Sequence, residues 1–268
     1  MTQIPVFQTV VSVYLYLWQE RKHLWQLTLP PIVILSILGA LVQWGTTSSI
    51  ETNNNISYIG IHRSGWVAAL SYITLFISIW IWLSYSVAWH RRYLLGGDGN
   101  NTLIAYGWSR RQLRFFWTAI KIFTLMIPAL LVFTLFMTPA AFGVTLLVLG
   151  LLTYGYVYAR LLLWFPAVAV DHQLNIRSLW QLSENNGWRL LSIFVSVSMP
   201  LIILSLLAYL ITGPLGFFAH TTQYLSVALL SNLLFKFLSF MELAASISAL
   251  SIAYQYFLDG GHTRLAPE

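Results

Sequence analysis

Glu242 is the side chain whose position most suggests chemistry, because it is a carboxyl group inside a long apolar stretch. It lies fifteen residues before Phe257, within residues 233–257. At about 1.5 Å per helical residue, it would lie roughly 22 Å from the inner edge of a hydrocarbon layer about 30 Å thick. An ionisable group at that depth is either a proton or cation site or a hydrogen-bonded clamp between helices. A lone carboxylate favours the clamp.

The neighbours of Glu242 offer few partners. Lys236 lies six positions earlier, about 120° away around a helix, so we expect it to extend to water at the outer boundary instead. Three groups at a similar depth could bind Glu242: Arg63, His62 and the hydroxyl of Tyr72. Small residues at four-residue spacing on the same stretch predict a helix-packing face, within the chain or between copies. These residues are Ala245, Ala249 and Ala253.

Arginine side chains form a second candidate site at the ends of the apolar stretches. They would lie at the depth of lipid phosphate groups, where each basic residue contributes on the order of 1 kcal/mol of attraction to an anionic surface. The alternative is that they only set the orientation of the chain. The predicted headgroup contacts are Arg91, Arg92, Arg110, Arg111, Arg114, Arg160 and Arg189.

The residues for enzymatic or metal chemistry do not occur in a usable pattern. The chain has no cysteine, and its six histidines are scattered over the sequence without a His-Glu-x-x-His motif. Gly96 to Gly99 lacks the Lys of a phosphate-binding loop, and Asp171-His172 has no evident nucleophile. We therefore expect no catalytic residues, no metal and no cofactor, and predict that the chain is not an enzyme.

The composition requires a second solvent besides water. The 268 residues are 58% hydrophobic and only 8% charged, with a mean hydropathy of +0.72. A chain so poor in charge cannot cover a soluble surface, so we predict an all-α membrane protein. The net charge of +6 does not indicate nucleic-acid binding, because the basic residues flank apolar stretches instead of forming one surface.

Six stretches are long and apolar enough to cross a bilayer as helices. They cover residues 27–46, 66–88, 116–137, 140–162, 188–211 and 233–257, in one polytopic domain spanning 1–268. Breaks are predicted at residues 45–63, at Thr138-Pro139 and at Gly213-Pro214. Of the 14 Lys and Arg residues, only Arg63 and Lys236 fall at the outer ends, which predicts that both termini are cytoplasmic.

The cytoplasmic connections are predicted to be amphipathic helices in the membrane interface. The first covers residues 5–24, where apolar residues recur at helical spacing. In the second, Ser109 would cap a short helix that carries Arg110, Arg111 and Arg114. In the third, Asn175 would cap a helix over 176–183 that stops at Asn185-Asn186-Gly187.

Residues 160–190 resemble a signature of a bacterial group of membrane proteins. The matching residues are Arg160, Phe165-Pro166-Ala167, Asp171, Ser178-Leu179-Trp180, Ser183, Asn186 and Trp188-Arg189. The group comprises the membrane domains of some glycerophosphodiester phosphodiesterases and the uncharacterised polytopic proteins similar to them. The catalytic domain is absent, so the resemblance implies only a helical bundle with an amphipathic elbow, and Asp171 or Glu184 as ion-pair partners of Arg160 and Arg189.

These observations predict an accessory or structural protein of a bacterial inner membrane. Its expected partners are phospholipids, with a larger membrane complex as a further expectation and no nucleic acid. The alternative is a small transporter or lipid translocator that uses Glu242 within the membrane.

Overall fold

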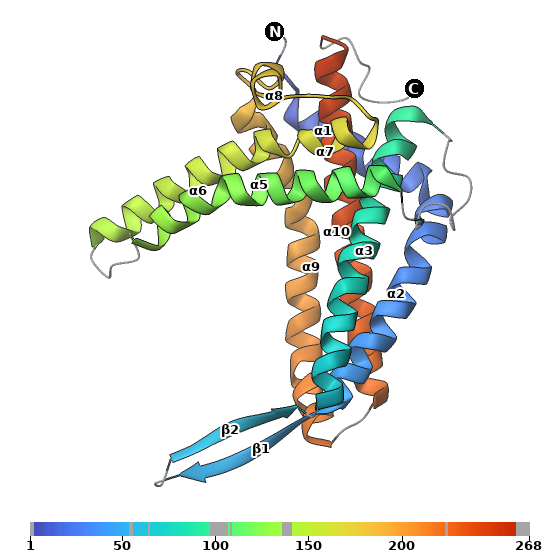
Figure 1. The fold of residues 1–268 in the computed structure, drawn as a ribbon, viewed down its shortest axis with the longest axis vertical. Helices are drawn as coiled ribbons and strands as arrows, with labels where there is room; N and C mark the ends of the chain where they lie inside the picture. Colours follow the sequence, from blue (N-terminus) through green and yellow to red (C-terminus); the bar gives the residue numbers. More distant parts are fainter. Residues whose placement is uncertain are drawn as a thin grey trace. The chain divides into compact units, whose positions relative to one another are not determined.

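The computed structural model describes residues 3–53, 56–63, 65–96, 107, 109–135, 141–222 and 225–260. Its described part is mainly helical (Figure 1). The chain forms two compact units. Unit 1 contains Met1–Glu20, Leu83–Ser198 and Ala244–Glu268, and unit 2 contains Arg21–Trp82 and Met199–Leu243. Three long helices contribute residues to both units: α3 (Gly65–Leu95), α9 (Gly187–Thr222) and α10 (Leu225–Leu258).

Five described helices are long and apolar enough to cross a membrane. They are Arg21–Trp44, Gly65–Leu95, Val148–Ala169, Gly187–Ile211 and Leu229–Leu258. In the most apolar window of Gly187–Ile211, only 17% of the residues are buried within the chain. A soluble protein does not expose large apolar faces of this kind, so the chain is a multi-pass membrane protein.

Each of these five helices overlaps one of the six predicted stretches, and the overlap is partial for 27–46 and 140–162. The stretch 116–137 lies in α5 (Arg110–Leu135), which is not among the five. Four basic residues occupy the first turns of α5, and its side chains are described only as far as Pro128. The predicted turn at Thr138-Pro139 lies outside the described residues.

Unit 2 is a bundle of α2 (Arg21–Trp44) with parts of α3, α9 and α10. Aromatic and amide contacts join its helices: the Trp25 ring stacks on Phe237 at 5.5 Å, and the Asn232 amide donates to Gln43 at 3.0 Å. The approach of α2 to α10 is close at Gly39, where an added Cβ would lie 2.4 Å from the Asn232 side chain. Glycine is therefore required there by space.

The polar break predicted at residues 45–63 contains two strands. Strand β1 (Thr46–Asn53) pairs with β2 (Ile56–Arg63) in antiparallel register, with Thr46 opposite Arg63 (Figure 1). β-branched and aromatic residues are frequent in both strands and suit extended structure, which explains why a segment read only as a break is extended. The hairpin is an addition to the helical fold class expected from composition.

Two other predicted boundaries were wrong. Helix α9 continues through Gly213-Pro214 to Thr222, and α10 begins at Leu225. A helix inside a membrane tolerates Gly and Pro because neighbouring groups satisfy the freed backbone. The prediction of one helix over 5–24 was also wrong, since α1 (Val6–Gln19) ends before Glu20 and α2 starts at Arg21.

Unit 1 contains α1, α5, α6 (Ala141–Leu161), α7 (Trp164–Ala169) and α8 (Ile176–Leu182), with the remaining parts of the long helices. Helix α5 lies beside α6 and α7 (Figure 1). The packing stripe of α10 lies in this unit, and Ala245, Ala249 and Ala253 are each at most 1% exposed. This face therefore packs inside the chain.

Candidate functional site

The segment between α6 and α9, residues 162–186 with α7 and α8, is called the elbow below. Its predicted capping is present: the Asn175 Oδ1 accepts from the Ser178 backbone N–H at 2.7 Å and starts α8. The elbow ends at Asn185, whose φ of 61° is left-handed, and α9 begins at Gly187. An added Cβ on Gly187 would lie 2.2 Å from Tyr156, so the close approach of α9 to α6 needs glycine.

Arg160 holds the elbow against α6. Its Nε donates to Ser183 Oγ at 2.8 Å, one Nη donates to Tyr156 Oη at 3.0 Å, and the other donates to the Trp180 carbonyl. The guanidinium also lies 3.7 Å from the centre of the Trp180 ring. With 4% exposure, Arg160 binds the chain itself, where the sequence analysis expected a lipid headgroup and an ion pair with Asp171 or Glu184.

Arg189 and Asn186 bind the N-terminal segment. The Arg189 Nη1 donates to the Ile4 carbonyl at 2.9 Å, and its Nη2 donates to the Gln3 side chain. The Ile4 N–H donates to Asn186 Oδ1 at 3.0 Å, and Tyr256 Oη donates to the Gln3 carbonyl at 3.1 Å. These bonds fix the start of α1 to the ends of α9 and α10 within unit 1.

Three of the predicted headgroup arginines lie around the Asp171 carboxylate. These three arginines and Asp171 are called the arginine cluster below. Arg111 donates two hydrogen bonds to Asp171 Oδ2, at 3.0 Å from Nε and 2.7 Å from Nη2. Arg91 lies 3.7 Å from the same oxygen and donates to the Ala169 carbonyl, and Arg114 lies 3.6 Å from Oδ1. Three cations around one carboxylate leave an excess of positive charge that attracts a further anion.

The electrostatics of the arginine cluster follow from this geometry. The hydrogen bonds from Arg111 hold the pKa of the Asp171 carboxyl below its usual range, against the opposing effect of partial burial. Asp171 itself has a left-handed φ of 63°, which Asp and Asn tolerate better than other residues with a side chain. The carboxylate therefore stays ionised at neutral pH.

The other predicted arginines have separate positions. Arg92 donates to Glu20 Oε2 at 3.1 Å from Nη2 and 3.3 Å from Nε, whereas Arg110 is exposed at the start of α5. Ser109 caps α5 itself, because its Oγ accepts from the Arg111 N–H at 3.2 Å. The predicted separate short helix is therefore the first turn of α5, and its cations are carried on the same helix as the stretch 116–137.

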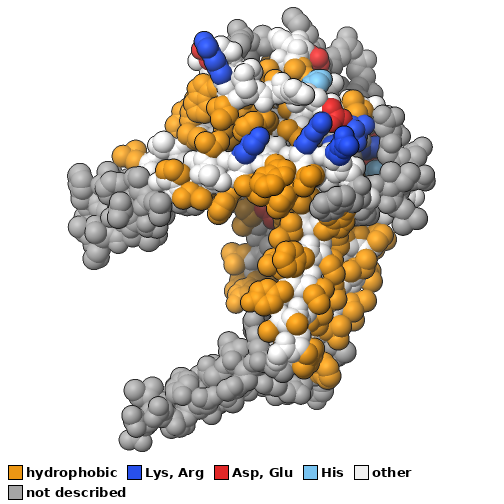
Figure 2. Space-filling view, in the orientation of Figure 1, with side chains coloured by type: hydrophobic (Ala, Val, Ile, Leu, Met, Phe, Trp, Pro, Cys, Tyr) orange, Lys and Arg blue, Asp and Glu red, His pale blue; other side chains and the backbone are white. Residues whose placement is uncertain are grey.

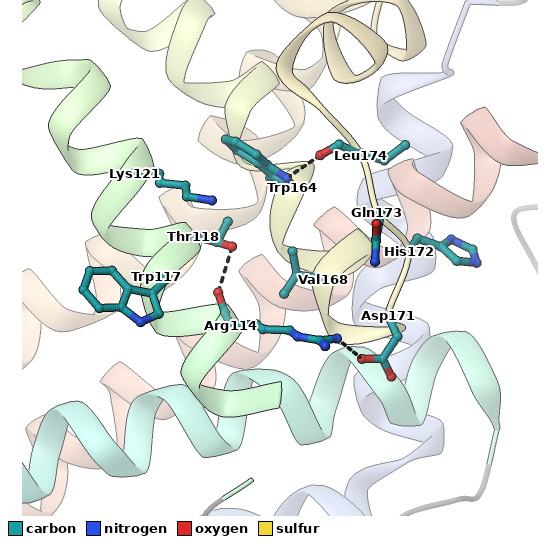
Figure 3. Close-up of a pocket in the computed structure, with 10 residues that line it drawn as sticks. All are labelled: Arg114, Trp117, Thr118, Lys121, Trp164, Val168, Asp171, His172, Gln173 and Leu174. Atoms are coloured by element: carbon teal, nitrogen blue, oxygen red, sulfur yellow. Dashed lines mark hydrogen bonds and ion pairs between the residues drawn. The ribbon is translucent and has the colours of Figure 1, made fainter. Parts of the chain in front are cut away.

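A cleft of about 460 Å³ adjoins the arginine cluster in unit 1 (Figure 3). Helix α5 contributes Arg114, Trp117, Thr118 and Lys121, which share one face at positions i, i+3, i+4 and i+7. The opposite wall comes from the elbow, with Trp164 and Val168 in α7 and residues 171–174 after it. In Figure 2, Lys and Arg side chains line up over α5, among apolar side chains.

Local contacts fix the shape of the cleft. The Trp164 indole donates to the Leu174 carbonyl at 3.0 Å, which ties the loop after α7 to the cleft wall. The Lys121 ammonium lies 5.8 Å from the Trp164 ring centre, a cation–π distance. The His172 imidazole turns away from Lys121 (Figure 3) and shares a 2.8 Å hydrogen bond with Tyr254.

The sequence analysis named only Arg114 among the residues that line this cleft as a site residue. The spacing of Arg114, Trp117 and Lys121 on one helical face was a usable signal, because basic and aromatic residues together suit a headgroup region. The contribution of Trp164 and Gln173 had no such signal. They meet α5 only because the elbow folds back against it.

The two intramembrane charges lie in unit 2, apart from this site in the sequence. Glu242 and Lys236 are both partly exposed. Among the described side chains, no hydrogen bond or ion pair joins Glu242 to Lys236, or to Tyr72, which is 66% exposed. The side chains of His62 and Arg63 lie outside those described, so their predicted pairing with Glu242 stays a prediction.

Comparison with known proteins gives no further assignment. No protein-family model, curated protein or solved structure matches the chain. The resemblance of residues 160–190 to the membrane domains of glycerophosphodiester phosphodiesterases therefore stays a prediction.

Proposed function

We propose that this chain is an accessory or structural protein of a bacterial inner membrane that holds anionic phospholipid at its cytoplasmic face. The observation that supports the proposal is the arginine cluster, in which Arg91, Arg111 and Arg114 share a single carboxylate, Asp171. Arg111 and Arg114 beside this one aspartate leave a net positive charge at one place. An anionic headgroup is the partner that such an excess selects near a bilayer.

The depth of the cluster fits this role. Asp171 follows directly after the candidate membrane-spanning helix Val148–Ala169, so it lies where a span reaches the headgroup region. Long apolar surfaces on the other spans provide lipid contact around the chain. The proposed orientation, with both termini cytoplasmic, places the cluster at the leaflet that carries most basic residues of the sequence.

Lipid selection in nanodiscs tests the proposal. Wild-type protein is reconstituted in phosphatidylcholine with a minor fraction of phosphatidylglycerol, and retained lipids are counted by native mass spectrometry. We expect enrichment of the anionic lipid in the wild type and its loss in the double variant Arg111→Gln/Arg114→Gln. The matched control Lys22→Gln/Arg177→Gln removes the same charge from exposed cytoplasmic positions and should keep the enrichment.

Two results would contradict the proposal. The wild type could retain both lipids in proportion to their supply, which would show no anionic selection. The control pair could lose as much enrichment as the cluster pair, which would reduce the effect to overall charge. Thermal unfolding of each variant in detergent identifies any loss that is due to misfolding alone.

A further inference from the structure

The cleft beside the arginine cluster has walls of two different kinds. Arg114 and Lys121 project from α5, seven residues and about 10.5 Å apart along the helix. The elbow side carries hydrogen-bonding groups of another type, the Asp171 carboxylate and the Gln173 amide. In Figure 3, Trp164 lies between Lys121 and Leu174, whereas Trp117 lies on the side of α5 away from the elbow. A volume of about 460 Å³ lies within the range of small-molecule sites.

The cationic side of the cleft suits an anionic phosphate group. The Arg114 guanidinium lies 3.6 Å from Asp171, longer than a hydrogen bond, so its N–H groups keep donor capacity toward the cleft. Among the described side chains, the Lys121 ammonium contacts the Trp164 ring. Because Arg111 already binds the Asp171 carboxylate, Arg114 and Lys121 leave positive charge on this side of the cleft. An anionic phosphate group neutralises that charge.

The elbow side of the cleft suits hydroxyl groups. Asp171 Oδ2 receives both Arg111 hydrogen bonds, so Oδ1 remains as an acceptor toward the cleft. The exposed Gln173 amide supplies both a donor and an acceptor. An ammonium group would have to compete with three arginines for Asp171 and would face Arg114 and Lys121 at close range. A neutral hydroxyl does not have to displace the arginines from Asp171, and it is not repelled by Arg114 and Lys121.

The surface of α5 next to the cleft provides a path for acyl chains. Beyond Lys121 on the same face of the helix, Leu125 is 46% exposed. Trp117, at 53% exposure, stands at the boundary where indole rings prefer to lie. Apolar surface that continues from a headgroup-sized cleft fits a lipid better than a free phosphate ester.

We propose that this cleft binds one phospholipid whose phosphodiester headgroup carries free hydroxyl groups. Arg114 and Lys121 bind the phosphodiester oxygens, Asp171 and Gln173 bind the hydroxyls, and Trp164 contacts the carbon skeleton of the headgroup. This inference rests on the proposed function, because it names the lipid that the same cytoplasmic site selects.

Native mass spectrometry titrations of the detergent-purified full chain test the inference. The probes are phosphatidylglycerol, phosphatidic acid, phosphatidylethanolamine and soluble glycerol phosphate. We expect one phosphatidylglycerol molecule per chain, bound about tenfold more tightly than phosphatidic acid, since two hydroxyl hydrogen bonds contribute about that factor. Glycerol phosphate should compete at least a hundredfold more weakly, because it lacks acyl chains.

Three variants separate the roles of the lining residues. Lys121→Gln should weaken both anionic lipids about equally, whereas Gln173→Ala should weaken phosphatidylglycerol alone, by about fivefold. The matched control Arg110→Gln removes a charge from the same helix outside the cleft and should change neither affinity. Thermal unfolding of each variant confirms that the fold is intact.

The possible failures are distinguishable. Equal or tighter binding of phosphatidic acid by the wild type would overturn the hydroxyl inference and leave anionic selection in place. Glycerol phosphate that competes as well as the lipid would show that the cleft takes a free ester and not a lipid. Equal binding of phosphatidylethanolamine and phosphatidylglycerol would overturn both this inference and the proposed function.

Discussion

At the scale of single residues, the chemistry of this chain depends on how its few charges are shared. Asp171 is bound by Arg111 and approached by Arg91 and Arg114, so one carboxylate organises three cations. Arg160, in contrast, is buried: four protein groups surround its guanidinium, and the residue is 4% exposed. Two arginines beside apolar stretches thus have different partners: Arg111 binds a carboxylate, and Arg160 binds hydroxyl, carbonyl and indole groups of the chain.

Asp171 predicts a dependence of stability on pH. Because its folded-state pKa is depressed, the ionised form favours the folded state above about pH 4, and this contribution is lost as pH falls through the folded pKa. The thermal unfolding midpoint of the wild type in detergent should exceed that of Asp171→Asn at pH 5–7. The difference should shrink at pH 3. Asparagine tolerates the left-handed φ of 63°, so the variant removes the charge and keeps the backbone.

A difference between wild type and Asp171→Asn that stays constant from pH 7 to pH 3 would contradict this assignment. It would mean that the ion pairs with Arg111 and Arg114 contribute nothing that titrates. Glu184 provides a control, because it is an exposed acid of the same elbow, and Glu184→Gln should leave the pH profile unchanged.

At the scale of elements, the elbow is the part of the fold that builds the site. Its helices α7 and α8 are only six and seven residues long, too short to be stable alone. Their position depends on Arg160, on the Asn175 cap and on the bond from Trp164 to Leu174. The position of Trp164 and Gln173 opposite α5 therefore depends on these contacts, and not on the stability of α7 and α8 alone.

Arg160→Lys should loosen the elbow. A lysine cannot donate in three fixed directions or stack on the Trp180 ring as a planar guanidinium does. We expect a loss of about 2–3 kcal/mol in stability, seen as a lower thermal midpoint in detergent and as faster amide hydrogen exchange in residues 164–186. The control Arg177→Lys changes an exposed arginine of α8 and should have no effect. Equal exchange rates in the two variants would show that Arg160 does not hold the elbow in place.

At the scale of the whole molecule, the chain is a multi-pass membrane protein with five described helices long enough to span. The distribution of Lys and Arg predicts that both termini are cytoplasmic and that the hairpin of β1 and β2 is outside. The proposed lipid site depends on this orientation, because the arginine cluster must face the leaflet to which we assign it.

The absence of cysteine from the sequence allows a direct test of topology. Single cysteines are introduced as Gln8→Cys in α1 and Ser57→Cys in β2, and are labelled with a membrane-impermeant maleimide. In right-side-out vesicles we expect labelling of Ser57→Cys alone, and in inside-out vesicles labelling of Gln8→Cys alone. The reverse pattern would place the arginine cluster on the outer face and contradict the proposed orientation.

The sequence by itself determined that this protein lies in a membrane, and it determined most of the helices. Hydropathy and charge depend on composition alone, so the membrane class and five spans followed directly. The cap at Asn175 and the stop before Gly187 were also predictable, because capping uses atoms only a few residues apart. The boundaries at residues 20 and 213 were not, since the packing of neighbouring helices outweighs local helix-breaking signals.

Only the tertiary structure decided which groups of the chain each arginine binds. Arg160 and Arg111 look equivalent in the sequence, both beside apolar stretches. Arg160 is buried because Ser183 and Trp180 return to it from the elbow, and Arg111 meets Asp171 sixty residues away. Contacts between residues so distant in the chain depend on how helices pack, and periodicity along the sequence carries no information about that.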